Sequence, residues 1–264
     1  EDLNVVVGVK EVLPQVAQAI EWAVSSLESG GRIVYFGAGT SGRLGVLDAV
    51  ECPPTFGVSP DVVVGLIAGG EKAFVRAVEG AEDSLELCEE ELKKIGLNKN
   101  DIAIGIAASG RTPYVIGGLR YARSLGCKTV AIACNKGSEV GKEAELAIEL
   151  SCGPEVLTGS TRLKAGTAQK MILNMISTGS MVGVGKAYQN LMVDVQQTNK
   201  KLVVRAQNIT MAATGCTREE AAQALERADG NAKLAIVMLL TQMPVEEAKA
   251  KLEAAHGHVR GALQ

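Results

Sequence analysis

Apolar residues follow two alternating patterns along most of the chain. Short runs that are almost wholly apolar, typical of buried parallel strands, alternate with stretches whose apolar residues recur every three or four positions, typical of helices. The runs predict five strands, in chain order at 32–36, 62–67, 101–106, 128–133 and 146–150. This repeated strand–loop–helix order predicts an α/β fold in which helices flank both faces of a parallel sheet.

The stretches between and after these strands predict the helices. We expect them at 9–29, 71–78, 84–95, 164–183 and 188–205, with others opening at the loops 37–42 and 109–112. The helix after the first of these loops should end near Val50, because Pro53 and Pro54 have no N–H to donate. The helix at 84–95 has Asp83 or Ser84 available as its N-cap.

The pattern changes at about residue 208. Thr217 and Glu220 form a capping box, and three short helices are predicted at 217–228, 231–241 and 245–255. We therefore divide the chain into a main domain at 1–205 and a helical module at 206–264. The module is similar in pattern to ubiquitin-associated three-helix folds, a likeness that concerns packing rather than ubiquitin binding.

The composition limits the kinds of binding partner and the cellular compartment that we expect for this protein. The formal net charge is -3, so no global positive field is available for nucleic acid or an anionic membrane surface. There is no run of about 18 apolar residues, and we expect no membrane span. The six cysteines are scattered without a C-x-x-C pair, which indicates reduced thiols in a cytoplasmic protein.

Two loops carry the same motif at the end of a predicted strand. Each places Ser-Gly-Arg where a helix opens, at the edge of the sheet where open α/β folds bind ligands. Helix N-termini offer N–H groups to an anion and hydroxyls add donors, so we predict a shared phosphate cradle. Its residues are Thr40, Ser41, Gly42 and Arg43 in the first loop and Ser109, Gly110, Arg111 and Thr112 in the second.

The first loop also fits a dinucleotide-binding fingerprint, Gly37-x-Gly39-x-x-Gly42. That fingerprint requires an acidic residue at the end of the next strand to bind the ribose. Here the second strand ends in Ile67 and Ala68, with no carboxylate, so we favour a compact phosphate over a nicotinamide cofactor. A third loop, which contains Ser160, Arg162 and Lys164, precedes a long helix and is expected to add N–H donors and two cations.

Proton transfer is assigned to carboxylates. The two histidines, His256 and His258, lie in the last ten residues, which argues against a Ser-His-Asp triad, a Cys-His dyad or a histidine-rich metal site. Glu51 is expected at the negative end of the first-loop helix, which favours a protonated carboxyl, and Glu82 before the positive end of the next helix, which favours an ionised one. Such a pair suits an acid and a base. Glu79 and Asp83 are close enough to be confused with Glu82.

Longer segments resemble the N-acetylmuramic acid 6-phosphate etherases, a family with the sugar isomerase (SIS) fold, a flavodoxin-like three-layer arrangement. The matching segments are GAGTSGRLGVLDA (37–49), ECPPTFG (51–57), VEGAEDS (78–84), AASGRTPYV (107–115), EVLTGSTRLKAGTAQK (155–170) and NLMVDV (190–195). A bare SIS domain would share only the serine-rich loops. The segments at 51–57 and 78–84 separate etherases from phosphosugar isomerases.

The resemblance implies a lyase that cleaves the D-lactyl ether of its substrate by elimination and water addition, without metal or cofactor, in cell-wall sugar recycling. Glu51 matches the general acid of the family and Glu82 its second catalytic carboxylate. The family's phosphate ligands match Ser41, Ser109 and Thr112, and a homodimer is implied. An aldose–ketose isomerase and a non-catalytic phosphosugar sensor remain as alternatives that share the phosphate cradle.

Overall fold

A computed structural model describes residues 1–76, 78–197 and 199–264. The chain forms two compact units. The first contains residues 1–51 and 60–180, and the second contains residues 52–59 and 181–264. The boundary expected between residues 205 and 206 stays a prediction, because a compact grouping does not show which part of a chain folds alone.

The first unit is built on a five-stranded parallel sheet. Its strands are β1 (Ile33–Gly37), β2 (Val63–Ile67), β3 (Ile102–Ala107), β4 (Lys128–Ala133) and β5 (Leu146–Glu149), in the order β2-β1-β3-β4-β5. In the register of the sheet, Gly37 pairs with both Ile67 and Ile106, so three strands end at the same level. The predicted parallel α/β sheet is confirmed, and its strands match the predicted apolar runs closely.

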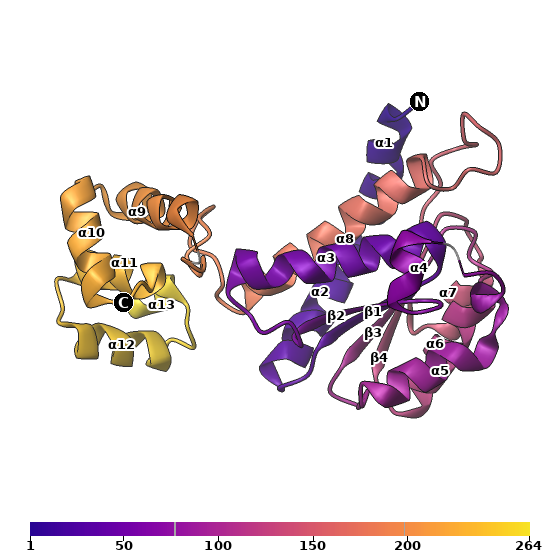
Figure 1. The fold of residues 1–264 in the computed structure, drawn as a ribbon, viewed down its shortest axis with the longest axis horizontal. Helices are drawn as coiled ribbons and strands as arrows, with labels where there is room; N and C mark the ends of the chain where they lie inside the picture. The colour runs from indigo at the N-terminus through magenta and orange to yellow at the C-terminus, as the bar shows by residue number, and fades with distance from the viewer. Residues whose placement is uncertain (77, 198) are drawn as a thin grey trace. The chain divides into compact units, whose positions relative to one another are not determined.

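Helices cover both faces of the sheet (Figure 1). One layer holds α2 (Leu13–Glu28), α3 (Gly39–Phe56) and α8 (Lys164–Gly183), and the other holds α5 (Leu85–Lys94), α6 (Pro113–Ser124) and α7 (Glu139–Glu143). Small residues allow these layers to pack closely. A Cβ on Gly65 of β2 would lie 2.6 Å from the Cα of Val46 in α3, so a larger residue would push the helix off the sheet.

The helix expected at 9–29 is divided in two. The chain forms α1 (Leu3–Glu11), leaves helical geometry at Val12 and resumes as α2, with Pro14 in the first turn. The break follows from the proline, which has no N–H for a continuous ladder but fits the start of a new helix. Helical periodicity alone therefore overlooked an interruption that a single proline imposes.

Other helix boundaries also differ from expectation. The helix α4 (Glu71–Val75) is shorter than the expected 71–78, while α7 and the 3₁₀ turn η1 (Ala81–Asp83) were not predicted. The helix expected at 188–205 is wrong, since α9 runs over Lys200–Thr214. Its N-cap Asn199 accepts a hydrogen bond from the Leu202 N–H, and Gly215 ends it in a left-handed conformation. Residues 77 and 198, inside two of these predictions, lie outside the described residues.

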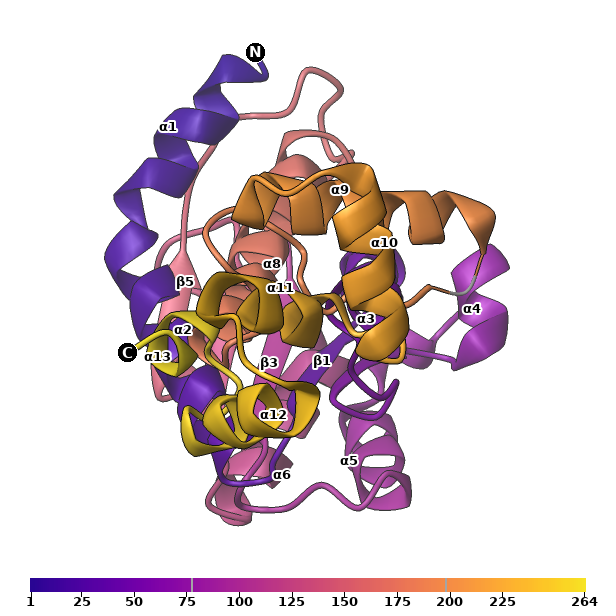
Figure 2. The same ribbon diagram turned by 90° about the vertical axis from the view of Figure 1, so that its left-hand side faces the viewer.

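The second unit is mainly helical. After α9 it contains α10 (Arg218–Arg227), α11 (Ala232–Thr241), α12 (Val245–Ala254) and α13 (Val259–Ala262), of which α13 was not predicted. Both hydrogen bonds of the capping box between Thr217 and Glu220 are present, as predicted. The apolar helix α11 packs against the other four, so it forms the centre of this unit's core (Figure 2).

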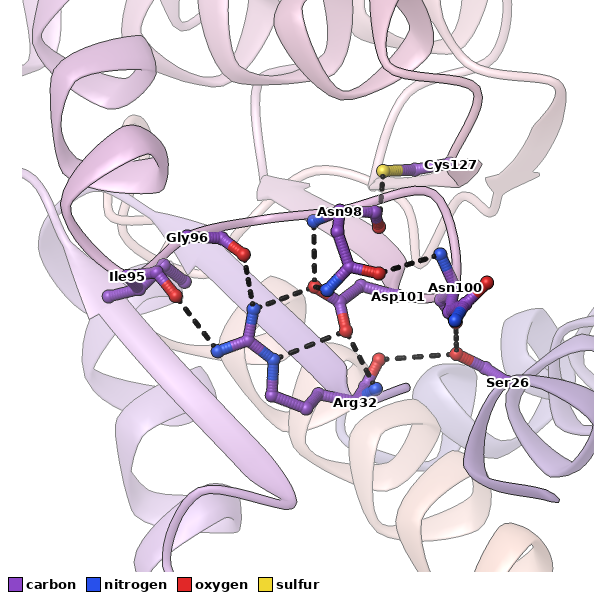
Figure 3. Close-up of polar contacts among 8 residues, drawn as sticks. All are labelled: Ser26, Arg32, Ile95, Gly96, Asn98, Asn100, Asp101 and Cys127. Atoms are coloured by element: carbon purple, nitrogen blue, oxygen red, sulfur yellow. Dashed lines mark hydrogen bonds and ion pairs between the residues drawn. The ribbon is translucent and has the colours of Figure 1, made fainter. Parts of the chain in front are cut away.

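An ion pair between a half-buried arginine and a buried aspartate joins the strands at the amino end of the sheet (Figure 3). Arg32, before β1, and Asp101, before β3, are joined by a 2.7 Å ion pair between Nη2 and Oδ2. Asp101 also accepts hydrogen bonds from the N–H and side chain of Asn98. The same guanidinium donates to the carbonyls of Ile95 and Gly96, which end the preceding helix. This network holds the amino edge of the sheet together, and each bond described here joins two residues of the chain.

Candidate active site

The two Ser-Gly-Arg loops leave neighbouring strands at the carboxyl edge of the sheet. Strands β1 and β3 are adjacent and parallel, and Gly37 pairs with Ile106 at their ends. The loops that follow them therefore start side by side, one leading into α3 and the other into α6. This is the arrangement that a cradle shared by the two loops requires.

The first loop closes tightly against the sheet. A Cβ on Gly37 would lie 2.8 Å from the Ile106 carbonyl oxygen, and Gly39 has a φ of +54°, which favours glycine. Ser41 is buried, and its hydroxyl donates a 3.0 Å hydrogen bond to Oε1 of Gln169 in α8. Thr40 lies beside the same helix, since a Cβ on Gly166 would meet its methyl group at 3.5 Å. The first turns of α3 and α8 are thus in contact.

Hydrogen bonds from a neighbouring side chain hold the second loop in place. One hydroxyl of this loop, that of Thr112, is not used as a helix cap. The Asn135 side-chain amide donates to the carbonyls of Ala108 and Ser109. Gly110 has a φ of +74°, and a Cβ there would overlap Ser138. Thr112 is the N-cap of α6, yet its side chain makes no cap hydrogen bond. Its half-buried hydroxyl is therefore not used by the helix that it begins.

The first turn of α6 is anchored to the adjacent helix α5. Tyr114, fully buried in its first turn, donates a hydrogen bond from its hydroxyl to Oε2 of Glu91 on α5. Burial raises the pKa of the Glu91 carboxyl and the pKa of the Tyr114 hydroxyl. A buried tyrosine of raised pKa stays protonated and remains a hydrogen-bond donor. The position of the second loop thus rests on an anchor in the adjacent helix.

A cavity of about 210 Å³ lies beside the first loop. Its lining comes from the ends of β1 and β2, from α3 and α4, and from the segment before α5: Ala38, Gly39, Arg43, Ala68, Ala73, Val78, Glu79, Gly80, Glu82 and Asp83. Three carboxylates and one guanidinium line this space. Glu82 is exposed and stands in η1, directly before the Ser84 N-cap of α5. Glu82 and the first loop therefore share one cavity.

The side chain of Arg43 is held by hydrogen bonds at the wall of this cavity. Its Nε donates to the Phe74 carbonyl at 2.8 Å and its Nη2 to the Ala73 carbonyl at 2.7 Å. These carbonyls lie at the end of the short helix α4, so the guanidinium supports the far wall of the cavity. Arg111, in the second loop, is exposed. The two arginines of the repeated motif therefore have different surroundings.

Glu51 lies farther along the same helix but not at its C-terminal end, where we expected it, because five helical residues follow it. The predicted end of α3 near Val50 is wrong: the helix continues to Phe56, and the Gly57 N–H bonds to the Pro53 carbonyl with a φ of +63° at the glycine. The prolines remove N–H donors, but the following turn still closes. Glu51 is exposed, does not line the cavity, and is separated from Thr40 by about 17 Å along the axis at about 1.5 Å per residue.

The third loop differs from expectation at the start of α8. The Glu155 carboxylate accepts hydrogen bonds from the N–H groups of Lys164, at 3.1 Å, and Ala165, at 3.0 Å. Those donors, expected to be free for an anion, are already occupied by a carboxylate of the chain itself. The Lys164 ammonium is buried and pairs with Glu1 at 2.6 Å. Arg162 is exposed and Ser160 half-buried.

Sequence reasoning overlooked buried polar side chains on α8. Gln169 contacts Ser41, and Asn174 and Ser177 donate to Oδ1 of Asp48 on α3 at 2.7 and 3.1 Å. The available signal was position: Gln169 and Ser177 lie among the buried apolar residues Ala168, Ile172, Leu173 and Ile176. A polar residue within an apolar helix face indicates a specific partner.

Burial makes some of the cysteine thiols poor nucleophiles. All six cysteines are free, as expected for reduced thiols. Burial raises the pKa of Cys127 to about 11 and of Cys134 to about 12, so both thiols are protonated and poorly nucleophilic near neutral pH.

Within the described parts of the chain, no group of three His, Cys, Asp or Glu side chains could hold a metal ion. Of the helices described, none is both long and apolar enough to cross a membrane.

Comparisons with known proteins agree with this architecture. The chain matches the model of the glucokinase regulatory protein N-terminal SIS domain over residues 15–123 and that of the SIS domain over residues 90–178. Among solved structures it is similar to a phosphoheptose isomerase from Neisseria gonorrhoeae, with a TM-score of 0.52 and 15% identity, covering 67% of this chain and 91% of that one. This likeness shows the SIS fold.

Curated relatives are much closer in sequence. An N-acetylmuramic acid 6-phosphate etherase from Cronobacter sakazakii is 61% identical over 264 residues, covering all of this chain and 89% of that protein. Another of the same name, from Bacillus cereus, is 59% identical over 263 residues and is covered to 90%. The likeness includes the C-terminal helices as well as the sheet.

Proposed function

Because this chain belongs to the N-acetylmuramic acid 6-phosphate etherase family, we propose that it cleaves the D-lactyl ether of N-acetylmuramic acid 6-phosphate. The products are N-acetylglucosamine 6-phosphate and D-lactate, and the reaction serves the recycling of cell-wall sugars. One structural observation carries the proposal furthest: Glu82 lines the same cavity as Gly39 and Arg43 of the first loop. This supports a base at Glu82, next to the first of the two loops to which the phosphate is assigned.

The proposed mechanism is an elimination followed by addition. In the open-chain sugar, the aldehyde acidifies the C2 proton, and the Glu82 carboxylate removes it. The C3–O bond then breaks, and Glu51 protonates the departing lactate oxygen. Glu51, now a carboxylate, takes a proton from the water whose oxygen adds to C3 of the unsaturated aldehyde, and Glu82 returns its proton to C2, which gives N-acetylglucosamine 6-phosphate. Glu82 and Glu51 are thus assigned as base and acid.

The phosphate is assigned to the two loops at the carboxyl edge. Ser41, Ser109 and Thr112 supply hydroxyls, and the start of α6 supplies the positive end of a helix dipole. The hydroxyl of Thr112, which is not used as a cap, supports this assignment. Thr40, Gly42, Gly110 and Arg111 complete the cradle. The exposed Arg162 is a better candidate for the lactyl carboxylate than Lys164, which is buried and paired.

The reaction can be tested with the full-length protein and N-acetylmuramic acid 6-phosphate. D-Lactate and N-acetylglucosamine 6-phosphate should form in equal amounts, and N-acetylmuramic acid without the phosphate should release much less lactate. Aldose–ketose interconversion of a sugar phosphate without lactate release would instead indicate an isomerase. Tight binding without turnover would indicate a sensor. Either result, obtained with folded protein, overturns the etherase assignment.

We also propose that the enzyme is a homodimer acting in the cytoplasm, consistent with its six free thiols. Apolar side chains on α1, α2 and α3 are exposed in the single chain, among them Leu3, Leu13, Leu47 and Val50. Glu51 follows directly after Val50, and it lies far along α3 from the phosphate loop. A second copy that covers the exposed residues of α3 would be able to bring its own Glu51 to the cavity of the first.

Mixing two inactive variants tests this arrangement. If each site takes Glu51 from one copy and Glu82 from the other, a mixed dimer of Glu51→Gln and Glu82→Gln contains one intact site. Random subunit exchange should then restore about a quarter of the wild-type activity. If both residues act within one chain, every site carries a substitution and the mixture stays inactive. Sedimentation of the wild-type protein as a monomer would exclude the dimer.

A further inference from the structure

The contact between Ser41 and Gln169 contains a buried donor without a partner. Gln169 has 0% exposure and Ser41 has 6%. The Ser41 hydroxyl donates to Oε1 of Gln169, while Nε2 of the same amide has no hydrogen-bond partner among the described residues. A buried donor left without an acceptor destabilises the folded state, because it has lost its hydrogen bonds to water. Such a group is rare in a folded interior, where polar atoms are usually paired.

The direction of this hydrogen bond conflicts with the function proposed for Ser41. Phosphate oxygens at neutral pH chiefly accept hydrogen bonds, so the serine must donate its proton to the ligand. In the structure that proton is donated to Gln169 instead. If the hydroxyl turns towards the phosphate, Oε1 loses its donor and the serine oxygen becomes available as an acceptor.

A half-turn of the Gln169 amide resolves the conflict. It exchanges Oε1 and Nε2, so the N–H that has no partner would donate to the Ser41 oxygen. The serine proton is then directed towards the ligand. We infer that Gln169 is a positioning residue, which turns Ser41 into a phosphate donor when the phosphosugar binds. This inference rests on the proposed function and adds to it a buried residue to which no role has been given.

The surroundings favour this role over simple packing. Gln169 lies near the start of α8, whose Gly166 is beside Thr40 of the same phosphate loop. Further along α8, Ser177 is also buried, but it donates to Asp48 in the body of α3 and has no link to the loop. The two residues therefore form a matched pair, one at the phosphate loop and one away from it.

The test measures the binding of N-acetylglucosamine 6-phosphate and of inorganic phosphate by calorimetry, which needs no turnover. Replacing Gln169 by the similarly shaped methionine should weaken both by about 10-fold, because Ser41 is no longer oriented to donate its hydrogen bond to the charged phosphate. KM for the etherase substrate should rise by the same factor, with kcat within about twofold. Ser177→Ala, the matched control, should lower thermal stability and leave the affinity unchanged.

A double-variant cycle separates positioning from structure. Because Gln169 acts through Ser41, adding Gln169→Met to Ser41→Ala should change the affinity no further. The inference is overturned if Gln169→Met weakens phosphate binding equally in proteins with and without the Ser41 hydroxyl, or if it does not weaken binding at all. If wild-type protein binds neither phosphate ligand, the proposed function fails instead, so the two failures are distinguishable.

Gln169→Glu provides a second, independent test if the Gln169→Met variant does not fold. The introduced carboxylate can accept from Ser41 but cannot donate, and it repels the phosphate. Its affinity loss relative to wild type should be largest at pH 8 and shrink towards pH 5, where a protonated carboxyl regains a donor. The ratio to wild type at each pH removes the titration of the phosphate itself. A ratio that does not vary with pH would contradict the inference.

Discussion

The two ends of the sheet use polar residues in opposite ways. At the amino end, Asp101 accepts hydrogen bonds from the main chain and side chain of both Arg32 and Asn98 (Figure 3). At the carboxyl end, the Thr112 hydroxyl makes no cap bond and the Gln169 amide has an unpartnered N–H in the described structure. The groups at the amino end are paired and hold the strands together, whereas these two groups at the carboxyl end keep spare bonding capacity. Substitutions at the two ends are therefore expected to have different effects.

The sharpest way to test this difference is to remove the proposed base. Glu82→Gln keeps the shape of the side chain and should lower kcat by about 10²–10⁴-fold, the usual contribution of a general base. The midpoint of urea unfolding should not change, because Glu82 is exposed.

Glu79→Gln is the matched control, since Glu79 lines the same cavity. It should retain activity within about a few-fold, because a surface carboxylate contributes only weak electrostatics. A larger loss for Glu79 than for Glu82 would show that the base has been assigned to the wrong member of this acidic group.

At the amino end we expect the reverse result. Asp101→Ala leaves Arg32 and two main-chain N–H groups without their acceptor and should lower the free energy of unfolding by about 3 kcal/mol or more. The kcat of the protein that remains folded should not change. Urea unfolding and steady-state kinetics measure the two quantities.

The exposed ion pair between Lys128 and Glu145 provides the control. Glu145→Gln should cost less than about 1 kcal/mol, because water solvates both groups when the pair is broken. If Asp101→Ala lowered kcat with little loss of stability, the amino end would take part in the chemistry after all.

A smaller effect is expected between the two ends, at Asp48. Burial raises the pKa of its carboxyl, although hydrogen bonds from Asn174, Ser177 and Tyr35 oppose the shift. The folded state therefore holds this proton more tightly than the unfolded state. Its contribution to stability is complete below the unfolded pKa and is lost as the pH rises through the higher folded pKa.

Asp48→Asn should abolish this part of the pH dependence. An asparagine keeps an oxygen for Asn174 and Ser177 without a buried charge, so the variant should unfold at a higher urea concentration than wild type at pH 8. The gain should be about 1 kcal/mol, the size of one hydrogen bond. Unfolding curves from pH 4 to pH 8 test this, and an unchanged pH dependence would show that Asp48 does not titrate in this range.

The sequence predicted the parts of the molecule that depend on local pattern. Apolar runs located the strands, and the parallel order placed the loops at Ser41 and Ser109 on one edge. Partners distant in the chain were not predictable. Nothing near Glu155 indicates that it caps α8, and the contact of Gln169 with Ser41 spans 128 positions. The helix through Pro53 and Pro54 also contradicted local propensity.

The central claim is that Glu82 removes the C2 proton and Glu51 protonates the lactate oxygen. Exchange of the C2 hydrogen of N-acetylmuramic acid 6-phosphate in D₂O, followed by NMR and scored together with lactate release, tests both roles directly. Glu51→Gln should still exchange the C2 hydrogen while lactate release is lost, and Glu82→Gln should lose both. Exchange that survives in Glu82→Gln at the wild-type rate would contradict the assignment.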